Sequence, residues 1–162
     1  MERWCKQKSN WVAKNPKLNI INLQRAFKLK KKLMKEQVLA LLQHEEVYCN
    51  ELSVYWLSNK RIKELHQQFF QDSSATDCIS IPIDDTNDCS GYRHLGEIFI
   101  CPQVAYEYAK SHEKEFYEEV TLYLIHGFLH LIGYNDIRKK EKLVMRKKEK
   151  ALMSLLKRKR LL

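Results

Sequence analysis

The sequence predicts a single α+β domain in which helices cover a sheet of about four strands. Its 162 residues fit the usual length of one domain and suffice to bury a core. Hydrophobic residues make up 44% of the chain, which has only four glycines and three prolines, and this composition is typical of a globular protein with long helices. Short segments rich in β-branched and aromatic residues alternate with longer segments whose apolar residues recur at helical spacing.

The strands are predicted from their residue types. β-branched and aromatic side chains pack well on a pleated surface, and they are frequent in four short segments. These segments are 18–22, 46–57, 75–83 and 94–101. Pro82 has no N–H to offer a neighbouring strand, so the third segment is expected near an edge of the sheet.

The helices are predicted from apolar stripes, capping residues and proline. Ser58 or Asn59 can cap one helix, Pro102 fits the first turn of another, and Ser111 can cap the helix that follows. The predicted helices cover about 23–44, the segment after Ser58 or Asn59, the segment after Pro102, about 112–132, and 137–160.

A candidate metal site lies at the end of the helix of 112–132. His126 and His130 are four residues apart, so on a helix they project from one face. Gly133 can end the helix in a left-handed conformation, and the chain can then return Asp136 to the same face. We therefore predict one Zn²⁺ per chain, held by His126, His130 and Asp136 with an open position for water. Nickel or iron suits the same ligands, and two histidines satisfied within a core helix are the structural alternative.

One further acid and one further glycine bear on this site. Glu119 lies two helical turns before His126, where it can hold the second nitrogen of a histidine or remain in solvent. Gly127 stands where metalloproteases of the H-E-x-x-H type have their general base. Because glycine cannot transfer a proton, the pattern favours a zinc hydrolase other than a protease and leaves the general base unassigned.

The segment from His126 to Asp136 resembles the signature H-G-x-L-H-L-x-G-Y-D-H of the YbeY-type endoribonucleases. Upstream, Thr76–Pro82 resembles the T-D-V-L-S-F-P strand of that family, and Leu95–Cys101 resembles its L-G-D-I-x-I-C segment. The resemblance implies a mixed four-stranded sheet with a zinc site in a cleft above it. It also implies cleavage of single-stranded RNA during maturation of ribosomal RNA.

The chain departs from the family pattern at two positions. Asp136 replaces the last histidine of the signature, and an anionic ligand should make a zinc-bound water less acidic than three histidines do. Phe70 occupies the place of an arginine that is thought to serve the active site of the family. Arg93 is the candidate replacement, because its guanidinium can bind a phosphate, although a solvated loop arginine is the commoner situation.

Charge is divided unevenly along the chain. Residues 1–35 hold 11 Lys and Arg against one acid, residues 36–136 hold 6 against 17, and residues 137–162 hold 12 against 2. A solvated helix face explains any single run of charge. Basic patches at both ends of an acidic middle are typical of proteins that bind a polyanion, here RNA, although an anionic membrane surface would attract the same patches.

These observations predict a metal-dependent hydrolase domain over 18–156, preceded by a basic arm of 1–17 and followed by a basic tail of 157–162. Five scattered cysteines without a C-x-x-C pair argue against disulfides, and no apolar run is long enough for a membrane span or a secretory leader, so we expect a cytoplasmic protein. The expected function is zinc-dependent endoribonuclease activity in ribosomal RNA maturation, ribosome biogenesis and quality control, with ribosomal RNA and ribosomal subunits as partners. A non-catalytic RNA-binding assembly factor and a zinc peptidase are the two alternatives.

Overall fold

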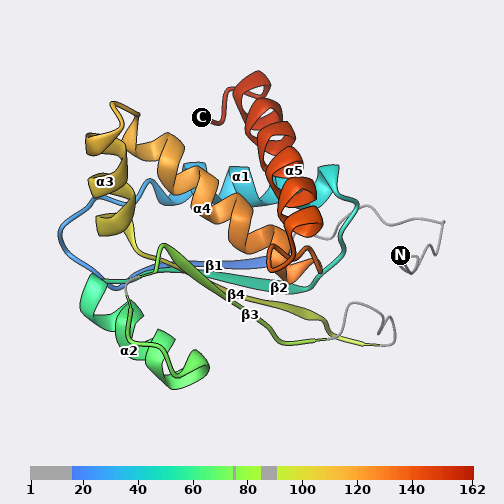
Figure 1. Cartoon of the computed structure of the whole chain (residues 1–162). Helices are drawn as coiled ribbons and strands as arrows, with labels where there is room; N and C mark the ends of the chain where they lie inside the picture. Colours follow the sequence, from blue (N-terminus) through green and yellow to red (C-terminus); the bar gives the residue numbers. More distant parts are fainter. Residues whose placement is uncertain (1–15, 75, 85–90) are drawn as a thin grey trace.

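The computed structural model describes residues 16–74, 76–84 and 91–162, and it confirms the predicted α+β domain (Figure 1). The strands are β1 (Lys17–Asn22), β2 (Glu51–Trp56), β3 (Cys78–Pro82) and β4 (His94–Ile100). The helices are α1 (Lys31–His44), α2 (Asn59–Phe70), α3 (Pro102–Ser111), α4 (Phe116–Leu131) and α5 (Lys139–Arg158). Residues 1–15, which form most of the predicted basic arm, lie outside the described residues.

The sheet is mixed, as the family resemblance implied. Its order is β1-β2-β4-β3, in which β1, β2 and β4 run parallel and β3 runs antiparallel to β4. β3 is therefore an edge strand, and Pro82 at its end agrees with the prediction made from that residue.

Helices α1, α3, α4 and α5 cover one face of the sheet, and α2 covers part of the other (Figure 1). The main core lies between the sheet and the larger group of helices, with Val54, Ile98 and Leu124 fully buried in it. Because Val54 and Ile98 are paired across β2 and β4, their side chains share this face. α4 contacts β3, β4, α3 and α5, so it is the central helix of this layer.

The first helix is shorter than predicted. α1 begins at Lys31, not near residue 23, because the side chain of Gln24 satisfies the backbone that a helix would use. Gln24 Nε2 donates to the carbonyl of Phe27 at 2.7 Å, and Gln24 Oε1 accepts from the N–H of Phe27 at 2.9 Å. Such local side-chain bonds compete with helical hydrogen bonds, and an apolar stripe alone does not show them.

The start of α4 was also predicted too early. Ser111 does not cap this helix, since its hydroxyl donates to the carbonyl of Tyr108 at 3.0 Å and so belongs to the end of α3. Glu113 has a left-handed φ of 53°, and the helix then begins at Phe116 with Glu115 as its N-cap residue. β2 likewise begins at Glu51 rather than at residue 46, because Glu46 also has a φ of 53°.

The basic end of the chain packs within the domain. α5 continues to Arg158, and the N–H of Leu161 donates to the carbonyl of Leu156 at 2.9 Å. The carbonyl of Leu161 in turn accepts from Gln37 Nε2 of α1 at 2.7 Å. Leu161 and Leu162 are partly buried against the main core, so packing extends to the last residue.

Gly127 lets α4 lie directly on the sheet. A Cβ atom at this position would lie 2.6 Å from Ile98 Cγ2 and 2.9 Å from Ser80 Oγ. The hydroxyl of Ser80 donates to the carbonyl of Gly127 at 3.0 Å, which ties β3 to the middle of the helix. Position 127 therefore faces β3 and β4, and it has no room for the glutamate that metalloproteases carry there.

Replacement of Gly127 with alanine is expected to lower the free energy of unfolding. The added methyl overlaps a branched side chain of a central strand, which costs about 1–3 kcal/mol. That cost exceeds the gain of about 1 kcal/mol that alanine brings to a helix interior. Urea unfolding of Gly127→Ala and of the control Gly91→Ala, where a Cβ meets nothing within 4 Å, measures the difference. Equal stability of the two variants would contradict the close packing.

Candidate metal centre

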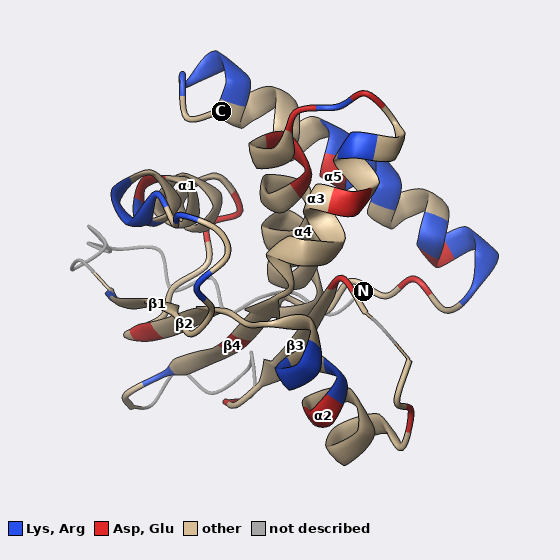
Figure 2. Cartoon of the chain, turned by 90° about the vertical axis from the view of Figure 1, so that its left-hand side faces the viewer, with Lys and Arg blue, Asp and Glu red and all other residues tan. Residues whose placement is uncertain are grey.

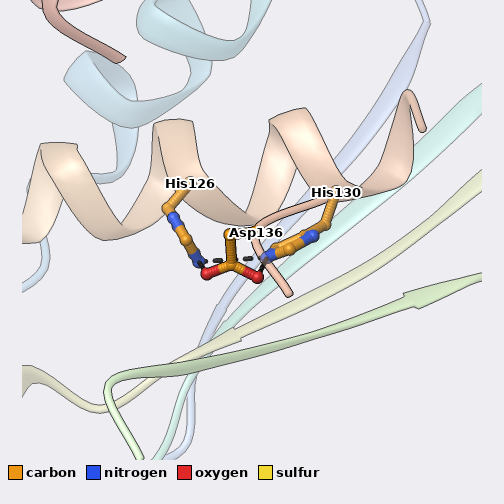
Figure 3. A group of neighbouring side chains, drawn as sticks. All are labelled: His126, His130 and Asp136. Atoms are coloured by element: carbon orange, nitrogen blue, oxygen red, sulfur yellow. Dashed lines mark hydrogen bonds and ion pairs between the residues drawn. The ribbon is translucent and has the colours of Figure 1, made fainter. Parts of the chain in front are cut away.

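The C-terminal end of α4 brings two histidines and one aspartate together (Figure 3). His126 and His130 project from the same side of the helix, one turn apart. After α4, Gly133 adopts a φ of 92°, and the N–H of Tyr134 donates to the carbonyl of Leu129 at 3.0 Å. This reversal returns Asp136 to the two imidazole rings, which is the turn that Gly133 predicted.

The three side chains have the spacing of metal ligands. One ligand atom from each of His126, His130 and Asp136 lies within 4.8 Å of the others. The two Nε2 atoms are 3.0 Å apart, and each lies 3.8 Å from one carboxylate oxygen of Asp136. Ligands about 2 Å from a tetrahedral zinc ion are roughly 3.3 Å from one another, so the donor set fits such an ion with small adjustments.

Hydrogen bonds to the other ring nitrogens orient both histidines. His126 Nδ1 lies 2.7 Å from Glu149 Oε1 of α5, and His130 Nδ1 lies 3.0 Å from the carbonyl of Tyr134. A carboxylate and a carbonyl only accept, so both Nδ1 atoms carry hydrogen. Each Nε2 is thereby directed toward Asp136, and carboxylate or carbonyl partners of this kind raise the basicity of metal-binding histidines.

The same contacts give the two imidazole rings different pKa values. Burial lowers the pKa of His126, but the hydrogen bond and negative charge of Glu149 outweigh burial and raise it above the ordinary value. Burial and the neighbouring His126 lower the pKa of His130. His126 is therefore the more basic of the two rings, and the 3.0 Å contact between their Nε2 atoms lies where a metal would bind.

Glu149 was not identified from the sequence, which drew attention to Glu119 instead. Glu119 is only 5% exposed, so it is not a solvated acid, and burial raises its pKa. Its carboxylate lies 3.9 Å from Lys114 Nζ and does not contact either histidine. Glu149 comes from a helix rich in lysine, where an isolated acid looks like an ordinary surface residue until the packing of α5 on α4 is known.

Arg93 is buried and not solvated as the loop position suggested, with 8% of its surface exposed. Its Nη1 donates to the carbonyl of Tyr48 at 2.7 Å, and its N–H donates to Asn50 Oδ1 at 2.7 Å. These contacts join the starts of β2 and β4. None of them involves the two histidines, and the suggested role of Arg93 in phosphate binding stays a prediction.

The position of the missing family arginine is solvent-exposed. Phe70, at the end of α2, is 56% exposed, and its ring lies 5.4 Å from that of His66. His66 Nδ1 lies 3.3 Å from the carbonyl of Ser74. An aromatic ring at this position cannot bind a phosphate through charge.

An open pocket of about 480 Å³ adjoins the histidines. His126 and Glu149 form one part of its lining, and Asp77, Glu119 and Tyr123 form another. Asp77 Oδ1 accepts from the N–H of Cys78 at 2.8 Å, which fixes this carboxylate at the start of β3. The pocket gives the metal centre an accessible, acidic side.

Two structural expectations from composition concern cysteines and membranes. Among the described cysteines, Cys49, Cys78 and Cys101 are all free thiols, in agreement with the prediction of no disulfides. No helix in the described part of the chain has the length and apolar character needed to cross a membrane.

Known proteins resemble this chain over most of its length. The family model described as endoribonuclease YbeY matches residues 17–157. A protein named endoribonuclease YbeY from Protochlamydia amoebophila is 43% identical over 140 residues, which cover 86% of this chain and 93% of that protein. Its namesake from Chlamydia pneumoniae is 37% identical over 146 residues, or 88% of this chain and 92% of that protein.

A solved structure supports the same relationship. The solution structure of a Thermotoga maritima protein superposes with a TM-score of 0.60 at 27% identity, covering 88% of this chain and 91% of that one. From the matched model, the identities and the shared fold, the chain belongs to the endoribonuclease YbeY family.

Proposed function

We propose that this chain is a zinc-dependent endoribonuclease that cuts single-stranded RNA and acts in the cytoplasm on ribosomal RNA during ribosome maturation and quality control. The family supplies the endoribonuclease activity, and the observation that carries the zinc dependence is the grouping of His126, His130 and Asp136 within 4.8 Å. Two imidazoles and a carboxylate leave a tetrahedral ion one open position, as catalytic zinc sites require.

A zinc ion held by these three residues would polarise a water molecule and take up charge from phosphate oxygens. The protein groups around it have separate tasks. Glu149 and the carbonyl of Tyr134 hold the two rings with Nε2 toward the ligand position. The pocket beside His126 leaves the site open to water, and its carboxylates favour a cation there.

A peptidase role is not supported by residue 127, which is the position of the general base in H-E-x-x-H metalloproteases. Residue 127 faces Ile98 and Ser80 on the sheet and not the pocket. A glutamate placed there would bury its charge against a branched apolar side chain, which folded proteins avoid. Hydrolysis of a phosphodiester, with charge stabilisation supplied by the metal centre, fits the residues better.

Removal of single ligands is expected to abolish both metal binding and cleavage. The full chain should bind one zinc ion and cut a ribosomal RNA fragment, whereas His130→Ala and Asp136→Ala should do neither, because two ligands hold zinc weakly. Metal analysis and gel assays of cleavage provide the two measurements. His112→Ala is the control, since this imidazole is exposed and bonds to Tyr108.

The same experiment separates the proposal from its main alternative. A native chain that holds zinc and binds RNA but cuts nothing is an assembly factor on a nuclease scaffold. Cleavage that persists in Asp136→Ala with zinc still bound would show that Asp136 is not a ligand.

Loss of the Glu149 carboxylate is expected to weaken the metal site without removing a ligand. Glu149→Ala should lower zinc affinity about tenfold to a hundredfold, the usual effect of losing a group that orients a ligand histidine. Competition with a zinc-binding dye measures the affinity. Glu119→Ala is the matched control from the same pocket, and an equal loss there would show a general effect of pocket charge.

Zinc affinity is also expected to depend on pH through His126. Its raised pKa means that a proton competes with the metal more strongly as pH falls. Affinity should therefore decline from pH about 8 to about 6, the range in which imidazoles titrate. In Glu149→Gln the pKa of His126 should fall, and the decline should move to lower pH. A decline at unchanged pH in this variant would contradict the role given to the Glu149 charge.

A further inference from the structure

The outer side of α5 carries a row of four cations, Lys139, Lys142, Arg146 and Lys150. Residues three or four apart lie side by side on a helix, so these four form one line, named here the α5 row. All four side chains are exposed, and Lys and Arg recur along the first half of this helix (Figure 2). The row extends about 16 Å along the helix axis.

The acids of α5 do not neutralise this row. The helix has nine Lys and Arg against two glutamates. Glu141 accepts from the backbone N–H of Arg138 at 3.1 Å, and Glu149 turns away to His126. Among the described residues, the ion pairs of α5 lysines with carboxylates are those of Lys148 with Glu45 and Lys157 with Glu118, and neither lysine belongs to the row.

The row does not serve the helix itself. Lys139 and Lys142 lie at the start of α5, where the positive end of the helix dipole disfavours cations. Glu141 is the acid of this turn, and its carboxylate is used by the backbone N–H of Arg138. The positive charge of the row is therefore not placed to stabilise the helix.

The row also leads to the metal centre. Arg146 lies three residues before Glu149 and Lys150 directly follows it, while Glu149 holds the ring of His126 at 2.7 Å. An anionic chain lying along the row would therefore pass next to the candidate ligands. The pocket on the other side of His126 is lined by carboxylates and would repel the same chain.

We propose that the α5 row is the surface that binds the phosphate backbone of single-stranded RNA and leads it to the metal centre. This inference rests on the proposed function. It adds the surface along which the RNA substrate would reach the candidate ligands. An anionic lipid surface fits less well, because helices that lie in membranes insert their apolar face. Most of that face of α5 is already used, since Met145, Leu152 and Leu156 are at most 1% exposed in the core, and Leu143 and Val144 are its two large apolar side chains that remain exposed.

The test compares two sets of four charge removals in the full chain. One variant carries Lys139→Gln, Lys142→Gln, Arg146→Gln and Lys150→Gln. The matched control carries Lys28→Gln, Lys31→Gln, Lys32→Gln and Lys35→Gln, which remove the same charge from exposed positions at the start of α1. Binding to a fluorescein-labelled, unstructured RNA is followed by anisotropy in EDTA over a series of salt concentrations, so that no cleavage contributes.

The α5 variant should bind RNA at least tenfold more weakly than the native chain, and its plot of log affinity against log salt should be shallower by about 3. That change corresponds to four lost phosphate contacts at about 0.7 each on a single strand. The α1 control should stay within about threefold of native affinity. Circular dichroism confirms that both variants keep their helices.

Three results would overturn the inference: native affinity in the α5 variant, an equal or larger loss in the α1 control, or tighter α5-dependent binding to phosphatidylserine vesicles than to RNA. Failure of the nuclease function gives a different pattern. In that case the native chain never cleaves RNA, but RNA affinity still falls in the α5 variant and not in the α1 control. This result would support the binding surface and refute the nuclease activity.

Discussion

The close packing of α4 on the sheet is the constraint on which the rest of this structure depends. Gly127 allows the helix to touch Ile98 and Ser80, and the hydroxyl of Ser80 fixes its carbonyl. One side of α4 is thus committed to β3 and β4, which leaves another side for His126 and His130. A larger residue at position 127 would overlap Ile98 and Ser80 and push α4, with both imidazoles, away from β3 and β4.

The sequence predicted the elements that depend on local chemistry. Two histidines at helical spacing, a glycine and an aspartate predicted a grouping that the structure brings within 4.8 Å, and the strand segments and Pro82 predicted the sheet and one of its edges. Errors arose where a local side-chain bond replaced a helical one, as at Gln24. Glu149 and the burial of Arg93 depend on contacts between distant segments, which spacing along one chain does not show.

An acidic region and a basic region adjoin the candidate metal site. Carboxylates from α4, α5 and the residue before β3 line the pocket beside His126, whereas the exposed side of α5 carries the row of four cations. α5 belongs to both regions, because Glu149 points inward and its neighbours point outward. A polyanion and a divalent cation are therefore attracted to adjacent places without competing for the same residues.

The candidate ligands lie apart from the residues that hold the domain together. Small zinc-binding domains unfold when the ion is removed, because they have too little core of their own. In this chain the core that includes Leu124 and Ile98 contains none of His126, His130 and Asp136. An ion at these three residues would therefore add to a domain that already has a core and would not replace one.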